Sequence, residues 1–352
     1  MTVEDLMGGI RRGDTTALAR AISLVENGRD GAEPLLSSLH GTLGRAHRVG
    51  ITGPPGAGKS TLTEHLIRAF RERGRRVAVV AVDPTSPFSG GALLGDRIRM
   101  ESAALDPDVY IRSMATRGGA GGLATTTREV CDVLDAFGFD RILIETVGVG
   151  QSELAIAATA DTAALILVPE SGDGIQALKA GVMEIADIFV VNKADRPGAD
   201  RLRQEIEVVL GLRKGNAYRH VAAHHAARAD RRAAGPGASS DRGAPGPGWE
   251  PPVLPTVATE GAGVDALVDA LEAHHRHLET SQELGTRRRA RLERLTREVV
   301  DRSLRRLVWE AGPGEDTLRE GLDDVVSGAR TPYQLARDIV AAVRSGELHD
   351  AR

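Results

Sequence analysis

GPPGAGKS, at residues 53–60, stands between the apolar run HRVGIT (47–52) and the helix-like run TLTEHLIRAF (61–70). It is a complete GxxxxGK[ST] pattern, and a strand before it and a helix after it are the setting that a phosphate-binding loop needs. Its glycines let backbone N–H groups converge on phosphate oxygens at the start of a helix. The pattern predicts that Lys59 reaches the terminal phosphates of a nucleotide and that the Ser60 hydroxyl can bind Mg²⁺.

Similar apolar runs rich in β-branched residues recur along the chain, with helical patterns between them. The runs cover 47–52, 76–83, 108–113, 141–145, 164–169, 188–192 and 253–259. Short buried runs that alternate with helices of ten or more residues are typical of parallel strands covered on both faces. We therefore expect a doubly wound α/β fold with a mostly parallel sheet.

The pattern divides the chain into three parts. We expect one or two packed helices in 1–45, a P-loop nucleotide-binding domain in 46–280 and a helical extension in 281–352. Within the domain, the segment at about 233–252 is rich in Gly, Pro and Ser, which favours a loop. The extension has an apolar stripe at helical spacing: Leu292, Leu295, Val299, Leu304, Leu307 and Val308. An Arg-rich helix with such a stripe is typical of a subunit contact, which predicts a homodimer.

The composition excludes several classes of protein. Of 352 residues, 41% are apolar and 27% charged, which predicts a folded protein with a sizeable core. The net charge of −4 argues against a nucleic-acid partner. The single cysteine, Cys131, excludes an internal disulfide and fits a reducing compartment. The N-terminus lacks the apolar core of a signal sequence, and no apolar run reaches about 18 residues, so we expect a cytoplasmic protein without membrane contact.

The tetrad Asn192-Lys193-Ala194-Asp195 follows the run at 188–192 and has the form NKxD. A carboxylate at its last position can accept two hydrogen bonds from guanine, whereas adenine has no matching pair of donors. An unpaired buried carboxylate would cost a few kcal/mol, so the mismatch discriminates between the two bases. Together with the phosphate-binding loop, the tetrad predicts that the nucleotide is GTP or GDP.

The sequence ETVG at 145–148 ends the run at 141–145. P-loop enzymes place here an acidic residue that holds Mg²⁺ and a glycine that senses the γ-phosphate, roles that fit Glu145 and Gly148. The segment that follows, through Gln151, would act as a switch. Two further acids, Asp83 in VDPTSP and Asp96 in LLGDRIRM, could join the metal site or could equally be turn or cap residues.

Taken together, these motifs resemble the MeaB/ArgK family of G proteins, which belongs to the SIMIBI class of P-loop GTPases. The resemblance covers nearly the whole chain and includes ALARAISLVEN, TGPPGAGKST, VAVDPTSPFSGGALLGDRIRM, GFDRILIETVGVGQSE, ALILVPESGDGIQALKAGVMEIADIFVVNKAD and SGARTPYQLARDIV. It implies a GTP-hydrolysing chaperone that gates cobalamin loading and protects a cobalamin-dependent acyl-CoA mutase such as methylmalonyl-CoA mutase. It also implies homodimerisation through the C-terminal helices, and an adenosyltransferase as a further partner.

The resemblance assigns roles to individual residues. Contacts to the nucleotide would come from Gly53, Gly56, Ala57, Gly58, Lys59, Ser60, Thr61, Gly148, Asn192, Lys193, Asp195 and the backbone of Ala258. Mg²⁺ would be held by Ser60, Asp83, Asp96 and Glu145. Hydrolysis would depend on Lys59, Glu145 and Gln151, the last near the attacking water.

A third switch of the family corresponds to 171–181 in this chain. The residues that would report the nucleotide state to the mutase are Asp173, Gln176 and Lys179. This segment departs from the family pattern at Glu170 and Ala177, where glycines are usual.

Two other functions stay open. A metallochaperone GTPase of a neighbouring SIMIBI branch would use Cys or His clusters, and the candidate groups in this chain are His224-His225 and His274-His275-Arg276-His277. The older family label, a transport-system kinase, has no separate acceptor-binding motif to support it. An ATP-driven partitioning protein is disfavoured because Pro54 stands where that class carries a second lysine.

Overall fold

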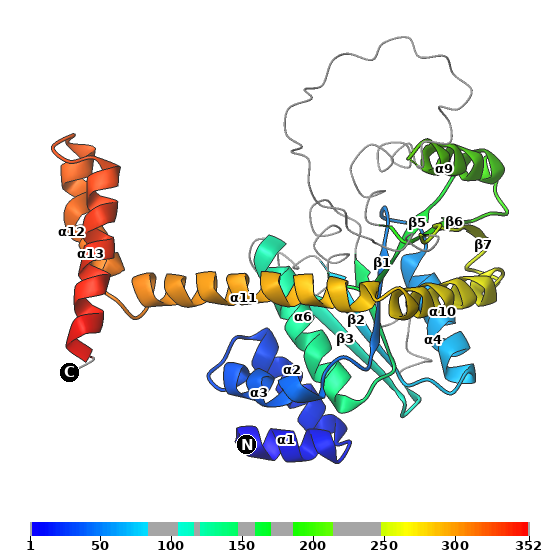
Figure 1. The fold of residues 1–352 in the computed structure, drawn as a ribbon, viewed down its shortest axis with the longest axis horizontal. Coiled ribbons are helices and arrows are strands. Elements are labelled where there is room, and N and C mark those ends of the chain that lie inside the picture. Colours follow the sequence, from blue (N-terminus) through cyan, green and yellow to red (C-terminus); the bar gives the residue numbers. More distant parts are fainter. Residues whose placement is uncertain are drawn as a thin grey trace, which may run out of the picture. The chain divides into compact units, whose positions relative to one another are not determined.

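The computed structural model describes residues 2–83, 105–115, 120–146, 159–169, 186–213 and 248–350. They form two compact units, Met1–Arg287 and Arg288–Arg352 (Figure 1). The first unit carries the sheet and both predicted nucleotide motifs. The second consists of most of helix α11 (Glu283–Trp309) followed by α12 (Gly314–Val326) and α13 (Pro332–Asp350).

The described strands form one seven-stranded sheet with the order β3-β2-β4-β1-β5-β6-β7, in which every neighbouring pair is parallel. Their bounds are β1 His47–Thr52, β2 Val77–Asp83, β3 Val109–Ala115, β4 Arg141–Thr146, β5 Thr162–Leu167, β6 Ile188–Asn192 and β7 Val253–Thr256. The sheet confirms the doubly wound α/β fold, and all seven predicted runs contain a strand. The order changes direction at β1, which is where such sheets bind ligands.

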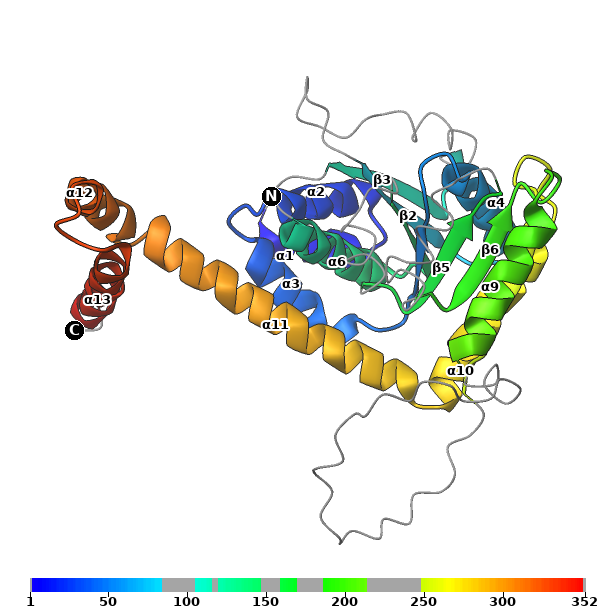
Figure 2. The same ribbon diagram turned by 90° about the horizontal axis from the view of Figure 1, so that it is seen from above.

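Helices cover both faces of the sheet (Figure 2). On one face, α4 (Lys59–Glu72) and α10 (Val264–Thr280) pack on alternate strand residues such as Val77 and Val79. On the other, α6 (Ala120–Phe137) packs on the intervening residues, such as Val80, and α9 (Ala199–Arg213) packs on β5 and β6. The near-continuous apolar sequence of the strands is therefore explained by burial on both sides.

The N-terminal segment forms three helices, so the expectation of one or two was wrong. They are α1 (Val3–Arg11), α2 (Thr15–Glu26) and α3 (Ala32–Leu39), and they pack against α6 through side chains such as Leu18 and Ile22. Local signals separate them: a capping box at Thr2 starts α1, and the Asp14 carboxylate caps α2. These short-range caps define boundaries that the apolar periodicity alone did not resolve.

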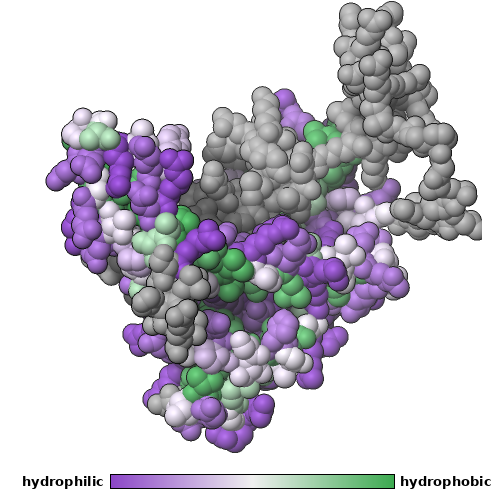
Figure 3. All heavy atoms as spheres, turned by 60° about the vertical axis from the view of Figure 1, so that its left-hand side comes forward, coloured by the Kyte–Doolittle hydropathy of each residue, from purple (hydrophilic) through white to green (hydrophobic). Residues whose placement is uncertain are grey.

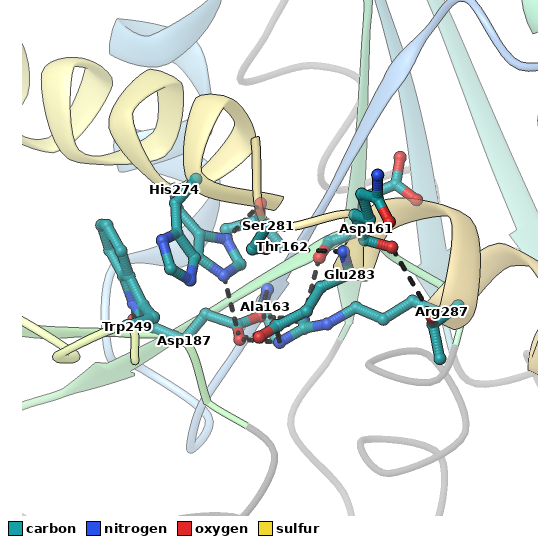
Figure 4. A network of polar contacts seen from close by, with 12 residues as sticks. Asp161, Thr162, Ala163, Asp187, Trp249, His274, Ser281, Glu283 and Arg287 are labelled. Carbon is teal, nitrogen blue, oxygen red and sulfur yellow. Dashed lines mark hydrogen bonds and ion pairs between the residues drawn. The ribbon is translucent and has the colours of Figure 1, made fainter. Parts of the chain in front are cut away.

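The amino ends of β1, β5 and β6 meet a buried polar network at the edge opposite the phosphate-binding loop (Figure 4). Thr162 Oγ lies 2.7 Å from His47 Nε2 and 2.8 Å from His274 Nδ1, while His274 Nε2 lies 3.3 Å from the Asp187 carboxylate. That carboxylate also accepts hydrogen bonds from both terminal nitrogens of Arg287, at 3.0–3.1 Å. The network thereby attaches α10 and the first turn of α11 to the sheet.

This network predicts sensitivity to acid. Burial lowers the pKa of His274 to about 4, against the opposing pull of Asp187, and burial also holds the pKa of His47 well below its usual value. Between pH 6.5 and 4, His274 binds a proton in the unfolded chain but stays neutral in the folded chain. The free energy of unfolding therefore falls as the pH drops through this window, by about 3 kcal/mol from His274.

Urea unfolding at a series of pH values measures this effect. In H274Q the fall between pH 6.5 and 4 is expected to be shallower by about that amount, while H40Q, which removes an exposed histidine, keeps the wild-type slope. A slope unchanged in H274Q would show that His274 is not held neutral by burial.

The second unit has a small apolar interior. Leu335, Ile339 and Val343 of α13 are buried, whereas Leu322 and Val326 of α12 are exposed. Figure 3 shows small apolar areas between the polar groups that dominate the described surface in that view. No described helix has both the length and the apolarity needed to cross a bilayer.

Candidate functional site

The predicted nucleotide motifs meet at the carboxyl edge of the sheet. The phosphate-binding loop follows β1, Glu145 lies near the end of the adjacent β4, and Asn192 ends β6. In open α/β sheets this edge, beside the point where the strand order reverses, is where ligands bind. The fold therefore brings together groups that lie more than 130 residues apart in the sequence.

The phosphate-binding loop requires glycine at positions 53 and 58, because both residues have a positive φ and lack the space for a Cβ atom. Gly53 has φ +142, and a Cβ there would lie 2.1 Å from the carbonyl oxygen of Ile166 in β5. Gly58 has φ +85, and a Cβ there would lie 2.4 Å from the Asn192 side-chain nitrogen. Since α4 begins directly after Gly58 without a side-chain cap, its first N–H groups are arranged as an anion site.

Lys59 lies inside the curve of the loop. Its Nζ donates hydrogen bonds to the carbonyl oxygens of Gly53, at 2.8 Å, and Pro54, at 3.0 Å, and the residue is only 6% exposed. A compact ammonium can contact both carbonyls from one point, a geometry that the planar guanidinium of arginine does not reproduce. The lysine therefore holds the loop closed and places a positive charge where phosphate oxygens would approach.

Ser60 and Glu145 face each other across the same edge. The Ser60 hydroxyl donates a hydrogen bond of 2.6 Å to Glu145 Oε1, and the glutamate is buried, with 4% exposure. A hydroxyl and a carboxylate form an all-oxygen donor set of the kind that Mg²⁺ prefers. The two residues thus provide donors of the kind that a magnesium site uses, and their role in binding Mg²⁺ stays a prediction.

Asn192 connects the loop to the segment after β7. Its side-chain nitrogen donates to the Ala57 carbonyl oxygen at 2.7 Å, and its side-chain oxygen accepts from Thr256 Oγ at 3.1 Å and from the Ala258 backbone N–H at 3.0 Å. One amide thereby fixes three segments relative to one another. The neighbouring Asp195 is exposed, which leaves its carboxylate accessible to a base.

Thr256 is a site residue that the sequence analysis did not single out. It ends β7 in register with Asn192 of β6, and its backbone carbonyl accepts a hydrogen bond of 3.0 Å from Ala194. The only feature of the sequence that could have pointed to Thr256 is its position in the last strand-like run, 253–259. Because that run lies some 60 residues beyond the NKxD tetrad, only the strand pairing connects the two.

The predicted site residues fall into two groups. The structure describes Gly53, Gly56, Ala57, Gly58, Lys59, Ser60, Thr61, Glu145, Asn192, Lys193, Asp195 and Ala258, and all lie along this edge. Asp83 ends β2, which is next to β4, but its side chain is outside the described part. Also outside the described residues are Asp96, Gly148, Gln151, Asp173, Gln176 and Lys179.

The histidines considered for a metallochaperone lie elsewhere. His274 belongs to the buried network at the opposite edge of the sheet, and its neighbour His275 stacks on His47 at 4.2 Å between ring centroids. Among the described residues, no group of three or more His, Cys, Asp or Glu side chains has an arrangement that could hold a metal ion. The pair at 224–225 is outside the described part of the chain.

Comparisons with known proteins show the family to which the chain belongs. A family model described as methylmalonyl Co-A mutase-associated GTPase MeaB matches residues 18–313. A Mycobacterium tuberculosis protein named "Probable GTPase" is 42% identical over 344 residues, covering 96% of this chain and 94% of that protein. The mouse protein named methylmalonic aciduria type A homolog, mitochondrial, is 33% identical over 364 residues, covering 97% of this chain and 80% of that protein.

Among solved structures, the crystal structure of an LAO/AO transport system kinase is similar in fold. It has a TM-score of 0.61 with 24% sequence identity, and the match covers 97% of each chain.

Proposed function

Because the chain belongs to the MeaB family of methylmalonyl-CoA mutase-associated GTPases, we propose that it is a GTP-dependent chaperone of a cobalamin-dependent acyl-CoA mutase, such as methylmalonyl-CoA mutase. GTP binding and hydrolysis would gate cobalamin loading and protect the mutase. The observation that carries this proposal is the family match over residues 18–313, which includes the whole nucleotide site. The name of the mouse relative, which refers to methylmalonic aciduria, also supports it.

The chain is a P-loop GTPase that binds guanine nucleotides. In our proposal the loop N–H groups and Lys59 bind the phosphates, while Asp195 pairs with the guanine edge and Asn192 holds the surrounding segments in place. Ser60 and Glu145 would hold Mg²⁺, which would supply positive charge to offset that of the nucleotide phosphates. Asp83 and Asp96 would complete its surroundings.

The remaining roles concern residues outside the described part. Gly148 would sense the γ-phosphate, and Gln151 would orient the attacking water. Gln151 stands three positions after Gly148 instead of directly after a DxxG glycine, so a partner would have to order the segment before hydrolysis becomes fast. We propose that Asp173, Gln176 and Lys179 report the nucleotide state to the mutase.

The proposed assembly is a homodimer through the C-terminal unit, located in the cytoplasm, with an adenosyltransferase as a further partner. The apolar side chains exposed on this unit support the dimer: Leu292, Val300, Leu304, Trp309, Leu322 and Val326. Exposed apolar groups in this number, next to a small interior, are typical of a subunit contact.

A GTPase assay with and without a purified acyl-CoA mutase tests the function. We expect slow turnover alone and acceleration with the mutase, and capture of the mutase that differs between GDP and a GTP analogue. K179A should keep basal GTP turnover within about threefold of the wild type and lose most of the acceleration by the mutase. In our proposal the substitution changes the contact with the mutase and leaves the nucleotide site intact. Equal turnover with and without the mutase, and no nucleotide-dependent capture, would contradict the proposal.

A further inference from the structure

Two threonines stand at the carboxyl ends of neighbouring strands, directly beside the nucleotide site. Thr52 is the last residue of β1 and precedes Gly53 of the phosphate-binding loop. Thr146 is the last residue of β4 and follows Glu145. Both threonines are buried, with 3% and 2% exposure. Each therefore adjoins a residue of the proposed site without belonging to it.

The two threonines share one face of the sheet, opposite to the face that carries the Ser60–Glu145 contact. In the parallel ladder of β1 and β4, Ile51 pairs with Glu145. Ile51 packs in the core on the α4 face, so Glu145 lies on that face too, where it meets Ser60 of α4. Because successive side chains of a strand point to opposite faces, those of Thr52 and Thr146 lie on the α6 face.

A hydroxyl contact joins these two strand ends. Thr146 Oγ donates a hydrogen bond of 3.3 Å to Thr52 Oγ. This distance is longer than the ~2.7–2.8 Å usual between two hydroxyls, so the contact adds little to folding stability. The adjacent residues on the same face, Ile144 in β4 and Val82 in β2, belong to the apolar core. Valine has the shape of threonine and suits such surroundings, so packing alone does not explain the two hydroxyls.

The contact matters for the site because it connects the start of the phosphate-binding loop to β4. On the β5 side, Gly53 lies so close that a Cβ would be 2.1 Å from the carbonyl oxygen of Ile166. Within the loop, the Gly53 carbonyl accepts a hydrogen bond of 2.8 Å from Lys59 Nζ. On the β4 side, the Thr52 hydroxyl reaches the residue that follows Glu145. The contact thereby fixes the separation between the start of the loop and the glutamate.

We propose that Thr52 and Thr146 are positioning residues for GTP hydrolysis. Their hydroxyl contact keeps Glu145 at the separation from Ser60 that shared binding of Mg²⁺ requires. This inference rests on the magnesium role proposed above for Ser60 and Glu145. Ser60 follows the loop that begins after Thr52, whereas Glu145 lies in β4, so one contact between the strand ends fixes both donors. Groups that orient metal ligands commonly account for roughly 10- to 100-fold in metal affinity.

Valine and serine substitutions in the full-length protein test this role. T52V and T146V keep the shape of the side chain and remove the hydroxyl, whereas T52S and T146S keep the hydroxyl. Mn²⁺, a paramagnetic substitute for Mg²⁺, is titrated into the complex of each variant with a non-hydrolysable GTP analogue. The electron paramagnetic resonance signal of free Mn²⁺ gives the dissociation constant. We expect it to rise about tenfold in each valine variant and to stay within about twofold of the wild type in each serine variant.

The double variant T52V/T146V tests whether the two hydroxyls act through one contact. Its Mn²⁺ dissociation constant should lie within about twofold of the single valine variants, because the second substitution removes nothing further. Its unfolding in urea should stay close to that of the wild type, since both partners are replaced by apolar groups of the same shape. Additive losses in the double variant would contradict a shared contact.

Two further measurements separate an effect on the metal from an effect on the loop or on folding. In EDTA, the affinity of each valine variant for the GTP analogue should stay within about threefold of the wild type. A loss in EDTA as large as the loss of Mn²⁺ affinity would mean that the threonines act on the loop. The matched control T42V removes a hydroxyl that donates to the Leu39 carbonyl at 2.7 Å, before the amino end of β1, and should bind Mn²⁺ as the wild type does.

E145Q distinguishes this inference from the magnesium role on which it rests. We expect E145Q to weaken Mn²⁺ binding at least as much as the valine variants do. If E145Q binds Mn²⁺ like the wild type, the magnesium role and this inference both fail. If E145Q weakens binding while T52V and T146V do not, the magnesium role stands and the threonine inference is overturned. Equal losses in the valine and serine variants would also overturn it, because the packing of the whole side chain would then be required.

Discussion

K59A is expected to lower kcat for GTP hydrolysis by about 10²- to 10³-fold, the typical cost of removing one preorganised charge or donor from the reacting group. The Lys59 ammonium lies between the carbonyl oxygens of Gly53 and Pro54, so it enters the site already oriented. Alanine removes the positive charge at the phosphates and also the two hydrogen bonds that close the loop. Single-turnover hydrolysis at saturating Mg²⁺ and GTP measures the loss of the chemical step apart from nucleotide binding.

K59R is the matched variant, because it keeps the charge and changes the shape. It is expected to remain at least tenfold slower than the wild type, since a planar guanidinium does not fit between two carbonyls that the compact ammonium bridges. Circular dichroism establishes that both variants are folded. Turnover of K59A within threefold of the wild type would show that the lysine serves only the conformation of the loop.

N192A should weaken GDP binding roughly 100-fold, the largest loss that we expect at the base site. The Asn192 amide contacts the loop at Ala57 and the β7 end at Thr256 and Ala258. Its removal leaves buried donors and acceptors unpaired, at about 1–3 kcal/mol for each such group, and about 3 kcal/mol in total corresponds to the predicted factor. Titration calorimetry with GDP gives the affinity directly.

T256V is the control for this prediction. It removes one of the three contacts of Asn192 and keeps the shape of the side chain, so GDP affinity is expected to fall about tenfold or less. If Asn192 acts by joining three segments, GDP affinity should decrease from the wild type to T256V and again from T256V to N192A. Equal loss in both variants would mean that the threonine contact alone accounts for the effect of the asparagine.

Much of the fold could be predicted from the sequence because its signals are local. The seven strands are β-branched runs of four to seven residues, and the parallel arrangement follows from the helices between them. The number of N-terminal helices was missed, because the Asp14 cap that separates α2 from α1 and the left-handed Gly31 that precedes α3 are local signals that apolar periodicity does not reveal. Caps act through one or two hydrogen bonds, whereas periodicity averages over a whole segment.

By itself the sequence determined the phosphate-binding loop with Ser60, the NKxD tetrad and the ETVG segment with Glu145 as separate candidates, because each motif has its chemistry within a few residues. Only the tertiary structure decided that Asn192 reaches both Ala57 and Thr256, and that Ser60 faces Glu145 at 2.6 Å. It also decided that His274 lies in a buried network at the opposite edge of the sheet. These relations depend on strand order and register, which are set by packing between residues far apart in the chain.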